Sequence, residues 1–184
     1  MTKSASRFTA DGVHAFPLRV YYEDTDTGRI VYYANYLKFA ERARTEVLRD
    51  LGIAQRELME QDGLAFAVRR CEVDYLSPAR LDDELEVRTT LRALGAASLD
   101  LDQAIYRCRS HDGHAEQELA RLVIRLAIIN RAGRPTRLPT RIMGLLRPLT
   151  VKRDLPDSAL DSVVESTAVQ SHVTIRATAN KKRA

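Results

Sequence analysis

Residues 21–52 read YYEDTDTGRIVYYANYLKFAERARTEVLRDLG, and this stretch decides the fold. From Asn35 onward apolar side chains recur three or four residues apart, which predicts an amphipathic helix. We expect Asn35 to be the N-cap residue and Gly52 to end the helix. The apolar face is wide, so other structure should wrap around it. Its members are Tyr36, Leu37, Phe39, Ala40, Ala43, Val47, Leu48 and Leu51.

An acidic loop precedes this helix. Residues 17–22 alternate apolar and polar side chains and predict a strand. Glu23, Asp24 and Asp26 then place three carboxylates within four residues, which a central strand does not tolerate. Gly28 permits a positive φ angle, so we expect a turn there.

Beyond the helix the apolar period changes to two, which predicts four strands at 64–75, 84–93, 99–108 and 119–129. The apolar phase slips near Arg69-Arg70, which predicts a β-bulge. Short helices are expected at 55–60 and 139–146. The chain is therefore predicted to be α+β, with one long helix packed across a strongly bent antiparallel sheet of about five strands.

The 184 residues suit one domain, which we place at 17–149, between a flexible N-terminal arm (1–16) and a disordered C-terminal tail (150–184). The net charge of +4 comes from 29 cations and 25 anions spread along the chain, so nucleic acid is not an expected partner. No apolar run is long enough for a transmembrane segment, and the first residues lack the apolar core of a secretory signal. The predicted location is the cytoplasm.

Residues 21–44 resemble the signature of hotdog-fold acyl-CoA thioesterases, in the branch of 4-hydroxybenzoyl-CoA thioesterase and the Tol–Pal-associated YbgC proteins. Residues 78–83, Pro-Ala-Arg-Leu-Asp-Asp, resemble the same branch more weakly. The resemblance covers about residues 17–145. It implies a hotdog fold, pairing of two copies into a dimer, often a tetramer, and active sites between subunits.

Thioester hydrolysis needs a nucleophile or general base, an oxyanion site and a slot for the acyl chain. From the residues alone, an acidic loop such as that of Asp26 is more often a solvated turn, although the helix start supplies N–H donors. The resemblance implies that Asp26 is the catalytic carboxylate and that the backbone N–H of Tyr33 is the oxyanion donor. Whether Asp26 acts as a nucleophile or as a base on water stays open.

Tyr33 departs from many YbgC-like sequences, which carry His at this position. A tyrosine has a reference pKa of about 10, so its side chain cannot act as a base near neutral pH. We therefore expect only the backbone N–H of Tyr33 to matter for the reaction.

Further substrate-binding candidates form three groups. The first group lies within the motif and consists of Gly28, Val31 and Tyr32. The second lies on an early strand and consists of Phe66 and Val68, which we expect to form the wall around the acyl chain. Basic side chains are expected near the CoA phosphates, and the candidates are Arg69, Arg70 and Arg92, each of which also fits a solvated surface.

Several alternatives remain. Glu41 is a second candidate catalyst, or else the ion-pair partner of Arg42 or Arg44. His111, Asp112 and His114 share a turn but lack a fourth ligand, so no metal is expected, and no nucleotide fingerprint indicates a cofactor.

Two other functions compete with hydrolysis. A hydratase of this fold would need a His, and none lies in the motif. An acyl-CoA-binding or acyl-carrier-protein-binding module without turnover is the other. In that case the basic end, residues 181–183, would contact the carrier protein or the inner membrane from the cytoplasmic side.

Overall fold

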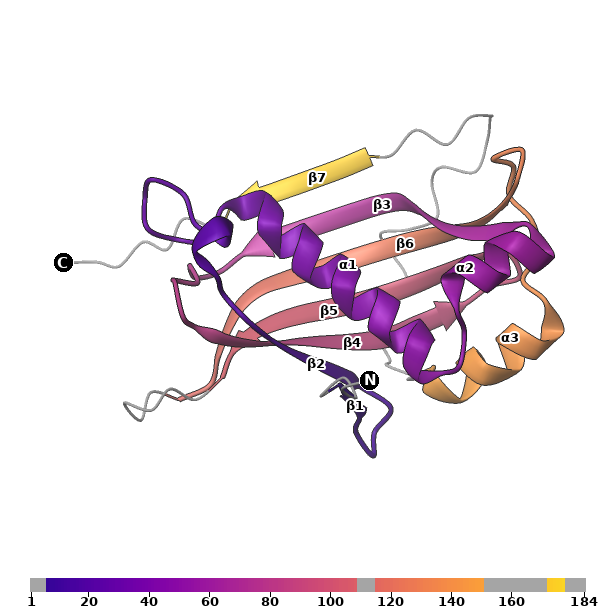
Figure 1. The fold of residues 1–184 in the computed structure, drawn as a ribbon, viewed down its shortest axis with the longest axis horizontal. Coiled ribbons are helices and arrows are strands. Elements are labelled where there is room, and N and C mark those ends of the chain that lie inside the picture. The colour runs from indigo at the N-terminus through magenta and orange to yellow at the C-terminus, as the bar shows by residue number, and fades with distance from the viewer. Residues whose placement is uncertain (1–5, 109–114, 151–171, 178–184) are drawn as a thin grey trace.

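The computed structural model describes residues 6–108 and 115–150, and the backbone of residues 172–177. Seven strands form one sheet in the order β1-β2-β4-β5-β6-β3-β7, and the long helix α1 lies across one face of it (Figure 1). The strands are β1 (Arg7–Phe8), β2 (His14–Arg19), β3 (Leu64–Tyr75), β4 (Glu84–Leu94), β5 (Ser98–Arg107), β6 (Gln117–Asn130) and β7 (His172–Ala177). The α+β architecture is the predicted one, with more strands than the expected five.

Helix α1 (Tyr33–Asp50) begins two residues earlier than expected. Asn35 is therefore not the N-cap residue, a position that Tyr32 occupies. Instead the Asn35 side chain is buried, and its Nδ2 donates a hydrogen bond of 2.9 Å to the carbonyl oxygen of Asp24. Gly52 ends the helix as predicted, with a φ angle of +75°.

The apolar face of α1 packs on the sheet. Tyr36, Phe39, Ala40 and Ala43 are buried in one core with the inward side chains of β4, β5 and β6. Shorter helical segments are η1 (Tyr22–Asp24), α2 (Gln55–Glu57), η2 (Leu58–Asp62), α3 (Thr140–Leu146) and η3 (Arg147–Leu149).

The predicted bulge in β3 is confirmed. The pairing of β3 with β6 shifts register between Val68 and Arg70. One extra residue on β3 changes which face the following side chains occupy, so the buried Cys71 and Val73 follow the slip.

Two expectations about the chain ends are wrong. Part of the 1–16 arm is in the sheet, because β1 pairs with β2 (Arg7↔Ala15) and β2 continues onto β4. Part of the 150–184 tail forms β7, which pairs in parallel with β3 from Arg70↔His172 to Tyr75↔Ala177. Residues 151–171 and 178–184 lie outside the described residues.

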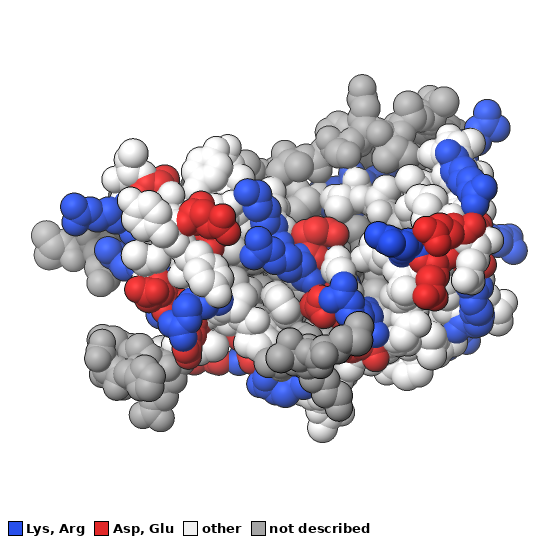
Figure 2. Space-filling model, viewed as in Figure 1, with Lys and Arg blue, Asp and Glu red and all other residues white. Residues whose placement is uncertain are grey.

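The charged side chains are mixed in sign. On the face that carries α1, Lys and Arg alternate with Asp and Glu instead of forming a basic field (Figure 2). None of the described helices is long and apolar enough to cross a membrane.

Candidate active site

The loop before α1 is closed by backbone hydrogen bonds. Thr25 and Val31 form an isolated antiparallel bridge, and inside it the Asp26 N–H donates to the Ile30 carbonyl at 3.0 Å. The Tyr32 N–H donates to the Asp24 carbonyl at 2.9 Å. The loop is thus held against the first residue of the helix, and Asp26 projects from it.

The positive φ angle that we expected at Gly28 belongs to Arg29, at +58°. Gly28 has a different role, because its N–H donates to Oδ1 of Asp26 at 2.7 Å. A Cβ atom at Gly28 would lie only 3.0 Å from that same oxygen. Gly28 therefore leaves room for the Asp26 carboxylate, which is exposed in the single chain.

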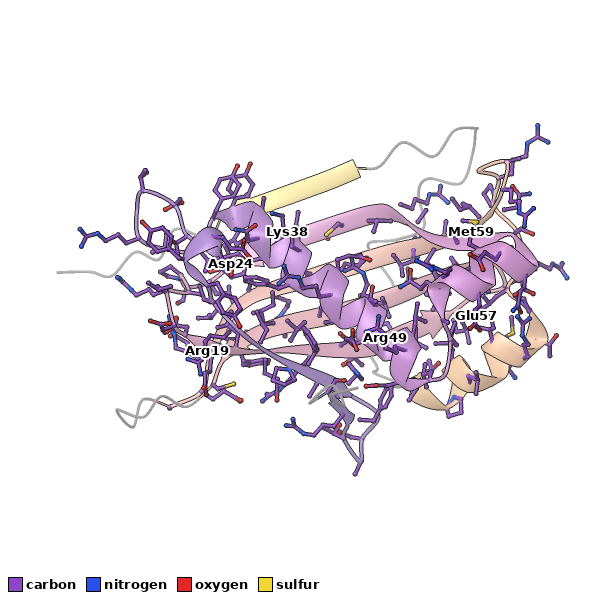
Figure 3. The ribbon with its side chains drawn as sticks, viewed as in Figure 1. Arg19, Asp24, Lys38, Arg49, Glu57 and Met59 are labelled. Carbon is purple, nitrogen blue, oxygen red and sulfur yellow. The ribbon has the colours of Figure 1, made fainter. Side chains whose placement is uncertain are left out.

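Asp24 is the buried carboxylate of the loop, with an exposed fraction of 5%. Its Oδ2 accepts a hydrogen bond of 2.9 Å from the Tyr21 N–H. In Figure 3 Asp24 lies beside the first turn of α1. Sequence reasoning gave Asp24 no specific task, since two aspartates in one loop look alike until tertiary contacts bury one of them.

Tyr33 is the first residue of α1, so its N–H has no acceptor within the helix and lies at the positive end of the helix dipole. Its carbonyl accepts a hydrogen bond of 3.0 Å from the Tyr75 hydroxyl. Burial raises the pKa of Tyr75 to about 12, so this phenol stays protonated as a donor. Tyr32 stacks at an angle on Tyr33, with ring centroids 4.6 Å apart.

The two stretches that carry the resemblance meet at Ala79. The Val31 N–H donates to the Ala79 carbonyl at 2.9 Å, and the Ala79 N–H donates to the Tyr36 hydroxyl at 2.8 Å. Val31 is buried by this contact, so it supports the loop from below.

Exposed tyrosines flank the loop in the sequence on both sides. Tyr21, Tyr22, Tyr32 and Tyr33 are exposed by 60%, 81%, 43% and 49%, and we call them the tyrosine patch. Exposed aromatic groups gathered in this way are typical of surfaces that bind a partner.

Phe66 and Val68 do not join Asp26. Both line a cavity under the C-terminal half of α1, together with Glu41 and Leu48. Glu41 follows Tyr33 by about 12 Å along the helix, at 1.5 Å per residue. The buried Tyr36, Phe39 and Ala40 lie between the two places.

The candidate CoA-binding arginines lie neither beside Asp26 nor at the cavity under α1. Arg70 and Arg92 alternate with buried residues that face α1, so they occupy the opposite face of the sheet. There Arg70 pairs with Glu72, and Arg92 with Asp102 at 3.6 Å. Arg69, at the bulge, is exposed. Glu41 pairs with Arg44, as the alternative reading expected.

No metal site is evident within residues 6–108 and 115–150, where no three potential ligands cluster. The turn with His111 and His114 lies outside the described residues.

Comparisons with known proteins agree on one family. The model described as "Thioesterase-like superfamily" matches residues 20–151. Acyl-CoA thioesterase YbgC of Haemophilus influenzae is 47% identical over 97 residues, which are 53% of this chain and 71% of that protein. Acyl-CoA thioester hydrolase YbgC of Escherichia coli O6:H1 is 50% identical over 90 residues, 49% of this chain and 66% of that protein.

Solved structures confirm the predicted hotdog fold. A probable thioesterase from Bartonella henselae has a TM-score of 0.63 at 37% identity, covering 69% of this chain and 99% of its own. A mutant 4-hydroxybenzoyl-CoA thioesterase has a TM-score of 0.67 at 19% identity, covering 72% and 97%, a likeness in fold alone. The family match takes in the Asp26 loop, all of α1 and the strands beneath it, and on that ground the chain belongs to the thioesterase-like superfamily.

Proposed function

We infer that this protein is an acyl-CoA thioesterase, which hydrolyses acyl-CoA to the free acid and CoA. We propose Asp26 as its catalytic carboxylate and the Tyr33 N–H as its oxyanion donor. One observation carries this assignment: the hydrogen-bonded loop 24–32 holds Asp26 directly before the first N–H groups of α1.

The chemistry follows from that juxtaposition. The Tyr33 N–H stabilises the negative charge that grows on the thioester oxygen when its carbon is attacked. With Asp26 as base, the carboxylate takes a proton from the attacking water and returns it to the departing CoA sulfur. With Asp26 as nucleophile, the C–S bond breaks to give a mixed anhydride, which water then hydrolyses.

The tyrosine patch supports a shared site. A single chain leaves Asp26 exposed, whereas thioester chemistry gains from a site that excludes water. We propose that a second copy covers the patch, which gives a homodimer and, by pairing of dimers, a tetramer. Tyr22→Ser should weaken assembly, as measured by analytical ultracentrifugation, and reduce turnover with it.

A hydratase is less well supported. His14 pairs with Asp50, the last residue of α1, which lies about 26 Å along the helix from Tyr33. It therefore cannot serve as an acid or base beside Asp26.

The direct test follows thiol release from acyl-CoAs of different chain lengths. Asp26→Asn should lower kcat by about a hundredfold or more. Glu23→Gln is the matched control, because Glu23 is an exposed carboxylate of the same loop. An unchanged rate for Asp26→Asn would remove the assignment, and tight acyl-CoA binding without turnover would favour the binding-module alternative.

A further inference from the structure

A second site of the molecule lies under the C-terminal half of α1. The cavity there holds about 710 Å³ of empty space when the part open to solvent is counted, so the enclosed space beneath the helix is smaller than this. Glu41 and Gln55 at its rim are exposed, so the cavity reaches the surface.

Part of the cavity lining is polar and includes His14, Thr89 and Arg44. His14 and Thr89 pair with each other across β2 and β4, Thr89 pairs with Gln103 on β5, and all three are buried. The Gln103 amide donates to the Ala40 carbonyl at 3.0 Å and to Thr89 Oγ1 at 2.9 Å. Arg44 donates to Gln103 Oε1 at 2.7 Å, which brings a guanidinium to this part of the lining.

The rest of the lining is largely apolar. It consists of leucines on β4, β5 and β6, joined by Phe66 and Val68 on β3 and by residues of α3 and η3. The strand leucines are Leu91, Leu99, Leu101 and Leu126. The cavity is thus amphipathic, with a hydrogen-bonding part and a hydrocarbon part.

His14 supplies an observation that points to a ligand. Its side chain is 1% exposed, and its Nε2 lies 2.9 Å from the Asp50 carboxylate. Burial alone would raise the pKa of Asp50, but hydrogen bonds from His14 and Ser6 leave it below its ordinary value. The Asp50 carboxylate is therefore ionised, and Nε2 carries the proton that it accepts.

The other ring nitrogen, Nδ1, is buried without a hydrogen-bond partner among the described residues. Buried polar atoms of native proteins are nearly always satisfied, so an orphan on a side chain of the cavity lining is a place where a water or a polar ligand group would be stabilised. A carboxyl group satisfies Nδ1 in either state of the ring. As an acid it donates to the neutral nitrogen, and as a carboxylate it accepts from the protonated one.

Arg44 favours the acid over an alcohol. Its guanidinium has five N–H donors and no acceptor, and it makes two hydrogen bonds among the described residues, to Gln103 and Glu41. The Arg44 side chain is only 11% exposed and already forms an ion pair with Glu41, so it would offer a carboxyl group its remaining N–H donors rather than an unbalanced charge.

We propose that this cavity binds a medium-chain carboxylic acid, with its carboxyl group against His14 and Arg44 and its alkyl chain among the leucines. The site is separate from the one proposed for hydrolysis and does not depend on turnover.

Decanoic acid is the probe. The full chain, labelled in its leucine methyl groups and its tyrosine rings, is titrated with the acid, and NOEs are recorded from the alkyl chain to the protein. We expect NOEs to the methyls of Leu99 and Leu101. An absence of binding, or NOEs confined to Tyr32 and Tyr33, would overturn the proposal.

Two variants separate filling of the cavity from general damage. Leu99→Phe occupies the space and should weaken binding by about tenfold or more in calorimetry, with no loss of thermal stability. Leu81→Phe, at an exposed leucine, should leave the affinity unchanged. Equal affinity of the Leu99→Phe variant would contradict the assignment.

The carboxyl contact has its own test. His14→Phe should weaken binding of decanoic acid by about fivefold or more, the value of a typical hydrogen bond. Methyl decanoate, which lacks an ionisable head, should bind the unmodified chain more weakly by a similar factor. If the ester binds as tightly as the acid, the head-group assignment is wrong even where the His14 variant fails to fold. All of these are binding measurements, so they can be made and interpreted even if the chain shows no thioesterase activity.

Discussion

The side-chain amide of Asn35 donates a buried hydrogen bond of 2.9 Å to the carbonyl oxygen of Asp24. This contact joins the acidic loop to the first turn of α1. It ties the segment that carries Asp26 to the start of the helix, on which the proposed chemistry depends.

Removal of that contact should affect both stability and catalysis. Asn35→Ala leaves the Asp24 carbonyl without this donor, and we expect the free energy of unfolding to fall by about 1–3 kcal/mol. Because the loop loosens, kcat for acyl-CoA hydrolysis should fall as well. Urea unfolding and thiol-release assays measure the two effects, and a normal kcat would show that the bond only stabilises the fold.

Gly28 should be sensitive to a single methyl group. Gly28→Ala places a Cβ atom 3.0 Å from Asp26 Oδ1, which pushes the carboxylate aside. We expect kcat to fall by about tenfold or more, since small misplacements of reacting groups are costly. Gly144→Ala is the control, because nothing lies within 4 Å of a Cβ there and α3 accommodates alanine. Equal rates for both variants would argue against a catalytic role of Asp26.

Gln103 should be a major stabilising residue. It is fully buried, with hydrogen bonds to Ala40, Thr89 and Arg44. Gln103→Met keeps the size of the side chain but strands these partners, at a cost of about 3 kcal/mol. The exposed Gln61→Met should change the unfolding free energy by less than about 0.5 kcal/mol. A small effect at Gln103 would mean that water replaces its amide.

Tyr75 should make stability fall in alkali. Burial raises its pKa from 10.0 to about 12 in the folded state. The unfolded chain therefore releases the phenolic proton first, and the contribution of Tyr75 to stability, complete below pH 10, is lost as the pH rises toward about 12. Burial also raises the pKa of Tyr36, so absorbance at alkaline pH should show late-titrating tyrosines, with one fewer in Tyr75→Phe. If the variant and the parent lose stability in parallel over this interval, Tyr75 is not the cause.

Local patterns predicted the elements well, for physical reasons that act over short distances. The apolar stripe of α1, the stop at Gly52 and the slip in phase near Arg69 all arise from side-chain periodicity and backbone freedom, which neighbours in sequence determine. The starting residue of α1 was missed because the Asn35 side chain reaches back to Asp24, a contact that no local rule contains.

Contacts between distant segments were harder to predict. The residues of β1 and β7 give little local indication of a strand. These two strands form where β2 and β3 offer open hydrogen-bonding edges. Phe66 and Val68 were expected as walls for the acyl chain of the substrate, and in the structure they line the same cavity as His14.

The sequence by itself determined the fold class, the family resemblance and the loop that carries Asp26, because apolar period and motif are written in consecutive residues. Only the tertiary structure decided that Asp24 is buried, that Gly28 makes room for Asp26, and that His14 lies beside Asp50 at an amphipathic cavity. The burial of Asp24 and the contact of His14 with Asp50 depend on packing between residues far apart in the chain, and they exist only once that packing is complete. The contact of Gly28 with Asp26 is local, but it depends on the conformation in which that packing holds the loop.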